Sequence, residues 1–375
     1  MKKEFAYICI SLLLIISSCK ESYEPPNIAM PKPLLVVEGN LDPSGPVSIR
    51  LTRTVSLDKN NTVQAENNAQ LVVEGKDNSI RNLTFVGNGY YKSAALNLAI
   101  GNEYRLKIIT STGKQYLSAF TKAQIAPAID SITWRQQPEG VRLYANTSDP
   151  ANATHYYMWN FTETWEYHSG FYSEVFVQSN GTLRPRILPA EDVHICWKSD
   201  SSKTVLIGNS LKLNVDRISE AQIQFVPAKE EKMSVRYSIL VRQYALSKDA
   251  YAYFELLKKN TESLGSIFDP QPSEDKGNIT CVSDPSEKVI GFITSSTVPE
   301  KRIFISNSEL NDWRLLYLEC MVDTVPKSTQ RIQQALSEGK LPFQDMGGPM
   351  PYLFSLAPCV DCTTKGGTTT KPLFW

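Results

Sequence analysis

Short apolar segments that alternate with polar residues recur along the chain from residue 34 to residue 126. They lie roughly ten residues apart, a spacing typical of all-β domains, and Gly, Asn, Asp-Pro and Ser-Thr-Gly separate them. The segments are LLVVEG, VSIRLTRTVSL, AQLVVEG, IRNLTFVG, YYKSAALNL, YRLKII and KQYLSAF. This pattern predicts an N-terminal β-sandwich over residues 34–126.

The stretch GNEYRLKIITSTGKQY shows the alternation most clearly. Tyr104, Leu106 and Ile108 are separated by basic residues, which is the period-two pattern of a strand with one buried face. Ser-Thr-Gly at 111–113 then predicts the turn of a hairpin. Tyr104, near the start of the strand, is a candidate tyrosine corner, although any buried strand tyrosine would give the same pattern.

A second region of strand-like segments begins at Pro127. Its segments are IDSITW, VRLYAN, HYYMWNFTETWEYH, VLIGNSLKLNV, AQIQFVP, MSVRYSILVRQYAL, VIGFITSS and KRIFIS. They predict a second sandwich, of the fibronectin or immunoglobulin type, over residues 127–308. The fold class is therefore mainly β, with two sandwiches.

The stretch LSKDAYAYFELLKKNTESLG interrupts this second region with a helical pattern. Ser247 is a candidate N-cap and Gly265 lies just beyond the expected end. The pattern predicts an inserted helix over residues 247–264 that packs on a sandwich through residues at helical spacing, namely Ala250, Tyr253, Phe254 and Leu257. From residue 309 the pattern changes, with a short helix expected in KSTQRIQQALSEG, so residues 309–375 are predicted to be a C-terminal extension packed on the second domain.

The first residues, MKKEFAYICISLLLIISSCKES, have the charged start and short apolar run of a secretory signal peptide. The run from Ile8 to Ile16 is shorter than the roughly 20 residues that a membrane-spanning helix needs. Ile16-Ser17-Ser18-Cys19 resembles the bacterial lipobox, in which the cysteine is lipidated and becomes the first mature residue. An ordinary cleavage near Ser18 would leave the position of Cys19 unexplained. We therefore predict a signal peptide over residues 1–18, acyl chains such as palmitate on Cys19 that hold the protein on a membrane, and a Pro-rich tether over residues 19–33.

Charge excludes nucleic acid as the expected partner. The chain has 39 basic and 39 acidic residues, and loss of residues 1–18 leaves 37 and 38. Phosphate binding needs a basic stripe, and no Lys/Arg-rich run is present.

Five cysteines remain in the mature chain after Cys19, and pairs among them are predicted to form disulfides, as is usual in exported proteins. The alternatives for Cys359 and Cys362, a Cys-x-x-Cys pair, are zinc and redox chemistry. Zinc would need a second closely spaced pair or a His pair, which the sequence lacks. A redox role would need a helix N-terminus, whereas Pro358 precedes the motif and a Thr/Gly-rich tail follows it. No metal site is therefore expected.

No sequence motif points to catalysis. The chain lacks a Gly-x-Ser-x-Gly elbow, a His-Glu-x-x-His pair, a phosphate loop and a dinucleotide-binding Gly-x-Gly-x-x-Gly. Glu163 and Glu166 lie among aromatic residues, but two such acids are too common to indicate a glycosidase. We expect no enzyme activity, no catalytic residues and no cofactor.

The aromatic stretch YYMWNFTETWEYHSGFY contains more rings than one buried strand face requires. Tyr157, Trp159 and Phe161 share one face and are expected to pack in the core. The rings beyond them are predicted to line an exposed loop near residues 168–170, as a weak candidate ligand-binding site: Trp165, Tyr167, Phe171 and Tyr172.

Several segments together resemble an outer-membrane lipoprotein family of the Bacteroidota known as domain of unknown function 4249. They are the lipobox, PKPLLVVEGNL, RQYALSKDAYAYFELLKKNTESLGSIFDPQPSEDKGNI, VIGFITSS and the tail CVDCTTKGGTTTKPLFW. The resemblance implies a tethered β-sandwich lipoprotein, often encoded beside TonB-dependent outer-membrane transporters, with no established catalytic residues. It also implies that Cys281 is the extra cysteine, and that the family's expected cysteines are Cys196, Cys320, Cys359 and Cys362.

From this resemblance we predict two long-range disulfides among those four cysteines, with Cys281 free and buried and the pairing left open. A local Cys359–Cys362 bond would close too small a ring to dock the tail. The expected function is a non-catalytic binding or accessory subunit of a TonB-dependent transporter, and the alternative is a structural or adhesive surface module. Lys20-Glu21-Ser22 loosely resembles a surface-export signal, so the expected location is the outer membrane, facing the exterior.

Overall fold

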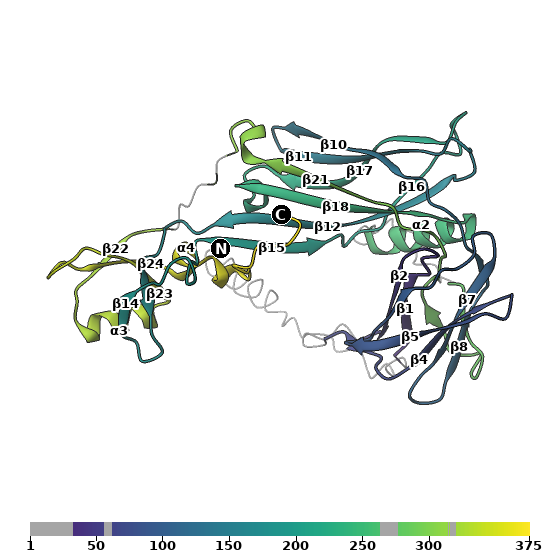
Figure 1. Cartoon of the computed structure of the whole chain (residues 1–375), viewed down its shortest axis with the longest axis horizontal. Coiled ribbons are helices and arrows are strands. Elements are labelled where there is room, and N and C mark those ends of the chain that lie inside the picture. Colours follow the sequence, from purple (N-terminus) through teal and green to yellow (C-terminus); the bar gives the residue numbers. More distant parts are fainter. Residues whose placement is uncertain (1–32, 56–61, 263–276, 314, 316–319) are drawn as a thin grey trace, which may run out of the picture.

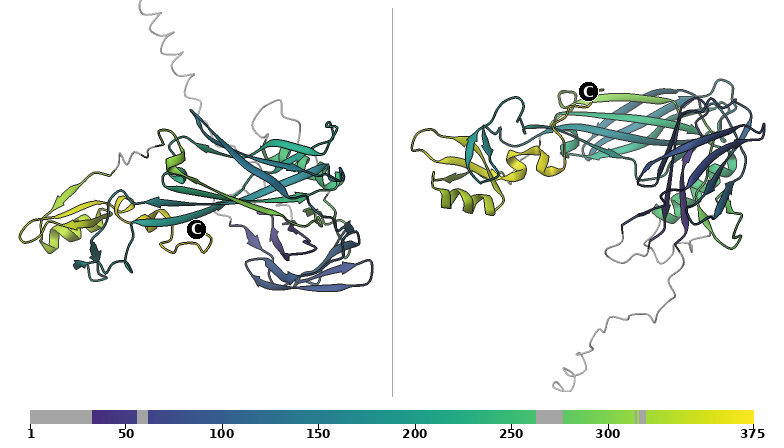
Figure 2. Two further views of the ribbon diagram at one scale, coloured as in Figure 1. Left: turned by 45° about the horizontal axis from the view of Figure 1, so that its top comes forward. Right: turned by 60° about the horizontal axis from the view of Figure 1, so that its bottom comes forward.

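The computed structural model describes residues 33–55, 62–262, 277–313, 315 and 320–375. The predicted signal peptide, the lipobox with Cys19 and nearly all of the tether lie outside these residues. The described residues are mainly β, as predicted. An N-terminal sheet lies at one end of a pair of long central sheets, and a smaller C-terminal subdomain lies beyond their other end (Figures 1 and 2). No helix among the described residues is long and apolar enough to cross a membrane.

The N-terminal sheet has eleven strands around a single apolar core. Nine of them form one hydrogen-bonded path, β3 pairs with β2, and β9 pairs with β7. Tyr104, Leu106 and Ile108 are all at most 2% exposed, which confirms the predicted alternation. The hydroxyl of Tyr104 accepts a hydrogen bond from the N–H of Ala99 at 2.9 Å, the backward contact expected of a tyrosine corner. The strands are β1 (Leu35–Asn40), β2 (Pro46–Arg53), β3 (Gln64–Ala65), β4 (Gln70–Gly75), β5 (Ile80–Gly87), β6 (Tyr90–Ala95), β7 (Glu103–Ile109), β8 (Gln115–Ser118), β9 (Thr121–Lys122), β19 (Ile279–Cys281) and β20 (Val289–Ile290).

Strands β19 and β20 correct the predicted domain boundary. Their residues were expected in the second sandwich, within residues 127–308. Instead β19 pairs antiparallel with β8, and β20 pairs parallel with β1. The predicted segment VIGFITSS begins with β20, whereas β19 was not among the predicted strands. A strand pattern also does not specify its hydrogen-bonding partner.

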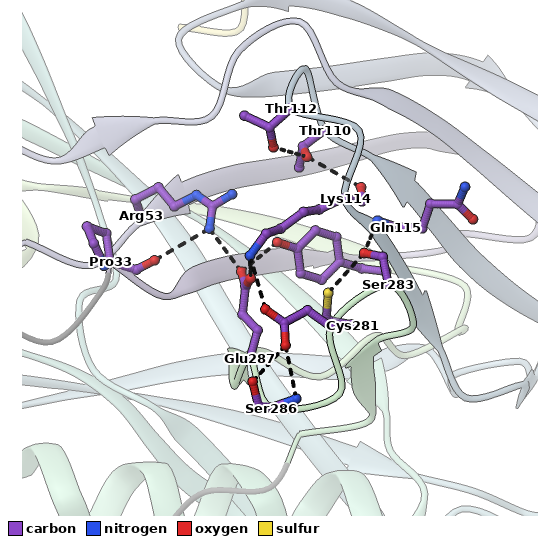
Figure 3. Close-up of polar contacts among 12 residues, drawn as sticks. Pro33, Arg53, Thr110, Thr112, Lys114, Gln115, Cys281, Ser283, Ser286 and Glu287 are labelled. Carbon is purple, nitrogen blue, oxygen red and sulfur yellow. Dashed lines mark hydrogen bonds and ion pairs between the residues drawn. The ribbon is translucent and has the colours of Figure 1, made fainter.

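Glu287, between β19 and β20, links this segment to the other strands of the N-terminal sheet (Figure 3). Its carboxylate accepts a hydrogen bond from the hydroxyl of Tyr116 at 2.6 Å and forms ion pairs with Arg53 and Lys114. Burial alone would raise the pKa of Glu287, but these donors lower it overall. The carboxylate is therefore held in its charged form, between strands from distant parts of the chain.

Two central sheets face each other across the second core. One has the order β10–β11–β17 and the other β15–β12–β18–β21, with β16 also paired to β12. Tyr157, Trp159 and Phe161 are at most 5% exposed in this core, as predicted. The strands are β10 (Ile129–Gln137), β11 (Gly140–Ser148), β12 (Tyr156–His168), β15 (Ile195–Ser201), β16 (Leu206–Asn209), β17 (Arg217–Pro227), β18 (Arg236–Ala245) and β21 (Glu300–Ser306).

Helix α2 (Lys248–Glu262) forms where the sequence predicts it, and residues 263 and 264 lie outside the described part. The hydroxyl of Ser247 accepts a hydrogen bond from the N–H of Ala250 at 3.1 Å, which confirms the predicted N-cap. Ala250 and Tyr253 are buried, but Phe254 and Leu257 are only half-buried. The predicted packing is therefore confirmed for Ala250 and Tyr253. Phe254 and Leu257 instead border a cleft.

The C-terminal subdomain, residues 320–361 with the hairpin β13–β14, combines a three-stranded sheet with a helix. The predicted short helix is confirmed as α3, with the Ser328 hydroxyl accepting from the N–H of Arg331. The elements are β13 (Val175–Val177), β14 (Leu183–Pro185), β22 (Asp323–Val325), α3 (Thr329–Ser337), β23 (Lys340–Asp345), β24 (Tyr352–Leu356) and α4 (Ala357–Val360); the short 3₁₀ turns of the chain are η1 (Glu231–Met233), η2 (Asn307–Glu309) and η3 (Cys362–Lys365).

Two disulfides join the four predicted cysteines, and Cys281 is free and buried, as expected. Cys196 in β15 pairs with Cys362, so this bond docks the tail onto the central sheets. Cys320 pairs with Cys359, 39 residues away and within the same extension. The expectation that both bonds dock the tail is therefore wrong for the second one, which closes a loop inside the C-terminal extension.

Candidate ligand-binding cleft between the two β-cores

A cleft of about 1440 Å³ lies where the outer face of the N-terminal sheet meets the outer face of the central sheets. Strands β1 and β2 supply one wall and α2 the other, and these elements lie side by side in Figure 1. A hollow of about 330 Å³ shares several lining residues with it and extends it along β12. The shared residues are Met158, Asn160, Ser202, Arg242 and Phe254.

The period-two alternation of the strands decides which side chains reach the cleft. In β2, Ile49 and Leu51 are fully buried in the N-terminal core, so Arg50 lies on the opposite face and lines the cleft. In β12, Trp159 and Phe161 fill the central core, so Asn160 lies on the opposite face. The same alternation that builds the two cores therefore presents polar residues between them.

The wall formed by α2 is apolar and aromatic. Ala250 and Tyr253 pack inward, and Phe254 and Leu257, further along the same face, line the cleft. The ring of Tyr253 lies 5.3 Å from that of Phe254 and 5.5 Å from that of Phe292. The result is a fixed group of tilted rings whose edge is open to a ligand.

The facing wall is polar, and its charges are compensated within the wall. Arg50 lies 3.7 Å from the carboxylate of Glu38, and its guanidinium stands over the ring of Tyr90 at 5.3 Å. Asp42 accepts a hydrogen bond from the N–H of Ser44 in its own turn at 2.9 Å.

The floor of the cleft comes from β12, β18 and β21. Asn160 donates to the hydroxyl of Tyr244 at 2.9 Å, and burial raises the pKa of Tyr244, which stays a neutral hydroxyl. Arg242 donates to Glu300 at 2.7 Å and to the hydroxyl of Thr162 at 3.0 Å. The charges on the floor are thus also paired with each other.

Two buried polar atoms of the lining have no hydrogen-bond partner among the described residues: Nε of Arg50 and Oδ1 of Asn160. A buried polar atom without a partner costs about 1–3 kcal/mol, so such atoms call for an explanation by water, an ion or a ligand. One is a donor on the N-terminal wall and the other an acceptor on the central floor. Both belong to side chains that line the cleft, but the atoms themselves are covered by neighbouring groups, so a ligand reaches them only when those groups move.

The junction beside the cleft holds the two walls in place. The side chain of Asn40 donates to the carbonyl of Ser296 at 2.8 Å and accepts from the hydroxyl of Thr294 at 2.8 Å. Gln124, in the segment that leads from β9 to β10, donates to the carbonyl of Ala245 at 2.9 Å. Because these contacts join the two cores directly, the cleft is preformed.

The structure places none of the predicted ligand-binding aromatics in this cleft. Trp165 and Tyr167 are 5% and 0% exposed in the central core, because β12 continues its alternation to His168. Phe171 stacks on Phe343 of β23 at 4.4 Å, and Tyr172 is 45% exposed. The expectation of an exposed aromatic loop is therefore wrong for Trp165 and Tyr167, and Phe171 is covered by the C-terminal subdomain.

Sequence reasoning missed the cleft because its residues carry no motif. They come from β1–β2, β12, β18, α2 and residues 290–300, which are far apart in the chain. The available local signal was that polar and half-buried positions alternate with core positions in each strand.

The fold and the cleft define a mainly β protein with two joined cores and a preformed hollow between them. A family model described as a domain of unknown function (DUF4249) matches residues 20–302. The chain belongs to this family, which confirms that part of the resemblance. A search of curated protein sequences finds no match.

Two solved structures share weak similarity with the chain. A two-domain fibronectin type-III segment of chicken tenascin is 12% identical, with 56% of this chain and 90% of that chain covered and a TM-score of 0.16. Chitinase ChiA74 from Bacillus thuringiensis is 10% identical, with 52% of this chain and 29% of that chain covered and a TM-score of 0.15. At these TM-scores neither similarity carries an argument about structure or function.

Proposed function

We propose that the protein is a lipid-anchored outer-membrane lipoprotein that serves as a non-catalytic binding or accessory subunit of a TonB-dependent transporter. The anchor would be acyl chains on Cys19, and the protein would face the exterior. The observation that carries the binding role is the preformed cleft with its two unpartnered polar atoms. We further propose that each β-core is a sandwich of the immunoglobulin or fibronectin type, in line with the two facing central sheets.

The electrostatics of the cleft support binding over catalysis. Glu38 is paired with Arg50, Glu300 with Arg242, and Asp42 with its own turn. A general acid or base must be within reach of the substrate proton that it transfers, whereas these carboxylates neutralise neighbouring groups of the protein. The walls therefore hold a ligand by shape and neutral hydrogen bonds.

The alternative is a structural or adhesive surface module. The observation that favours it is a set of exposed apolar side chains in the C-terminal subdomain, far from the cleft. Exposed apolar residues of this kind mark protein contacts when they gather in a patch. They are Met321, Val322, Met346 and Met350, which are 73%, 48%, 45% and 50% exposed.

Co-purification separates the two functions. The tagged full chain is solubilised from native membranes in mild detergent, and bound proteins are identified by mass spectrometry. The accessory role predicts a stoichiometric β-barrel partner. Recovery without any barrel protein would remove this role and leave the adhesive one.

A further inference from the structure

We propose that the cleft between the two β-cores binds a neutral oligosaccharide. This inference rests on the proposed role of the cleft as a binding site and adds the chemical class of its ligand.

The size of the cleft indicates an extended ligand. Sites for small molecules typically enclose roughly 300–1,000 Å³. The cleft has about 1440 Å³, and the adjoining hollow along β12 adds about 330 Å³. An elongated molecule that runs from the β1–β2 wall along the floor uses this space better than a compact one.

The charges of the lining indicate a ligand without net charge. Arg50 and Arg242 are already paired with Glu38 and Glu300. A charged ligand would have to compete with Glu38 or Glu300 for the arginine, or with Arg50 or Arg242 for the carboxylate. A phosphate, a nucleic acid or a charged polymer is therefore a poor match.

The unpartnered atoms indicate a ligand rich in hydroxyl groups. Nε of Arg50 needs an acceptor and Oδ1 of Asn160 needs a donor. A hydroxyl group is both donor and acceptor, so a hydroxyl-rich ligand that displaces the groups covering these atoms can serve either of them. An acyl chain would leave both atoms buried without partners.

Apolar side chains on both walls of the cleft suit the apolar faces of sugar rings. Phe254 and Leu257 are half-buried on α2, and the ring of Tyr90 is 37% exposed beside Arg50. Rings with one apolar face and a polar rim can contact these side chains while their hydroxyls reach Arg50 and Asn160.

The strand pairing argues against an extended peptide, the other neutral polymer. Peptides that bind β-proteins commonly add a strand to an open sheet edge. The strands β1, β2, β12 and β18, which line the cleft, are each hydrogen-bonded to neighbours on both sides. Recognition in this cleft must therefore come from side chains.

The test is calorimetric titration of the full, detergent-solubilised chain with maltohexaose, cellohexaose, xylohexaose and mannohexaose. Two variants probe the cleft. Arg50→Lys keeps the charge beside Glu38 and removes the Nε donor, and Phe254→Leu removes the ring. Matched controls are Arg81→Lys, on the exposed face of β5, and Phe374→Leu, a half-exposed ring of the tail.

We expect saturable binding of at least one hexasaccharide, weakened roughly tenfold by each cleft variant and unchanged within twofold by each control. No binding of any of the four sugars, equal binding by cleft variants and wild type, or equally cleft-dependent binding of a neutral hexapeptide would each overturn the proposal. A barrel partner that co-purifies with a chain that binds no sugar would leave the accessory role intact. Sugar binding without a barrel partner would support the oligosaccharide ligand and contradict the proposed partnership with a transporter.

Discussion

Tyr167 fastens the C-terminal tail to the central core with one buried hydroxyl. The residue is fully buried, and its hydroxyl donates to the carbonyl of Cys362 at 2.7 Å. A Cβ atom built at Gly367 would lie 2.2 Å from this hydroxyl, so only glycine allows the tail to approach so closely. Gly367 thus has a packing reason, whereas Gly366 has a φ of +83°, a conformation that favours glycine.

Burial, assisted by the charge of Glu231, raises the pKa of Tyr167 to about 12. A tyrosine whose folded pKa exceeds its unfolded value of about 10 stabilises the fold fully below that value, and the stabilisation is lost as pH rises through the folded pKa. We expect the free energy of unfolding to fall between pH 10 and pH 12, and to fall less steeply in Tyr167→Phe. Urea unfolding curves at several pH values measure both slopes, and equal slopes would contradict the assignment.

Single residues were predicted well where their partner is near in sequence. Tyr104 was a candidate tyrosine corner because it lies near the start of its strand, and its partner in the structure, Ala99, is only five residues away. Trp165 and Tyr167 were misplaced because their burial depends on how far β12 continues and on the tail that covers it. The alternation placed Arg50 and Asn160 on the outer face of their strands but gave them no binding role, since the cleft is formed by distant segments.

At the level of elements, α2 depends on its N-cap. Ser247 is exposed, so its main structural contribution is the hydrogen bond from the N–H of Ala250. Ser247→Ala should therefore lower the free energy of unfolding by about 1 kcal/mol, and Ser247→Asp should restore it. Urea unfolding monitored by circular dichroism measures both variants. If Ser247→Ala were as stable as the wild type, the helix would have to begin at another residue.

The existence of strands was predictable and their pairing was not. Alternation identified nearly all of β7, whereas only Val289–Ile290 (β20) of the predicted segment VIGFITSS forms a strand. The N-terminal sheet, however, takes β19 and β20 from beyond α2. Such pairings depend on contacts across more than 150 residues, such as that of Tyr116 with Glu287, and local sequence does not encode them.

At the scale of the whole molecule, the Cys196–Cys362 bond ties the tail to the central sheets. The tail adds backbone hydrogen bonds between Trp197 and Thr368, and the Trp375 indole donates to Glu166 at 2.9 Å. Replacing Cys196 and Cys362 together with Ala should cost ~2–5 kcal/mol and expose residues 366–375 to proteases. The Cys320→Ala/Cys359→Ala pair is the matched control and should leave the tail protected. Equal protease sensitivity of the two double variants would contradict this division of roles.

Membrane attachment is the second prediction at this scale. If Cys19 carries the lipid, Cys19→Ser should release the protein from the membrane fraction or leave an uncleaved precursor. Fractionation and mass spectrometry of the mature N-terminus measure this. Normal processing with unchanged membrane retention would remove the lipoprotein assignment.

The central claim is that the cleft between the two cores is the binding site, and amide hydrogen exchange tests it most directly. The full chain in detergent is compared with and without a saturating pool of the four neutral hexasaccharides. The account predicts slower exchange in peptides covering residues 36–50, 253–257 and 290–300, with no change in β22, β23 and β24. Unchanged exchange around the cleft, or protection confined to the C-terminal subdomain, would contradict it.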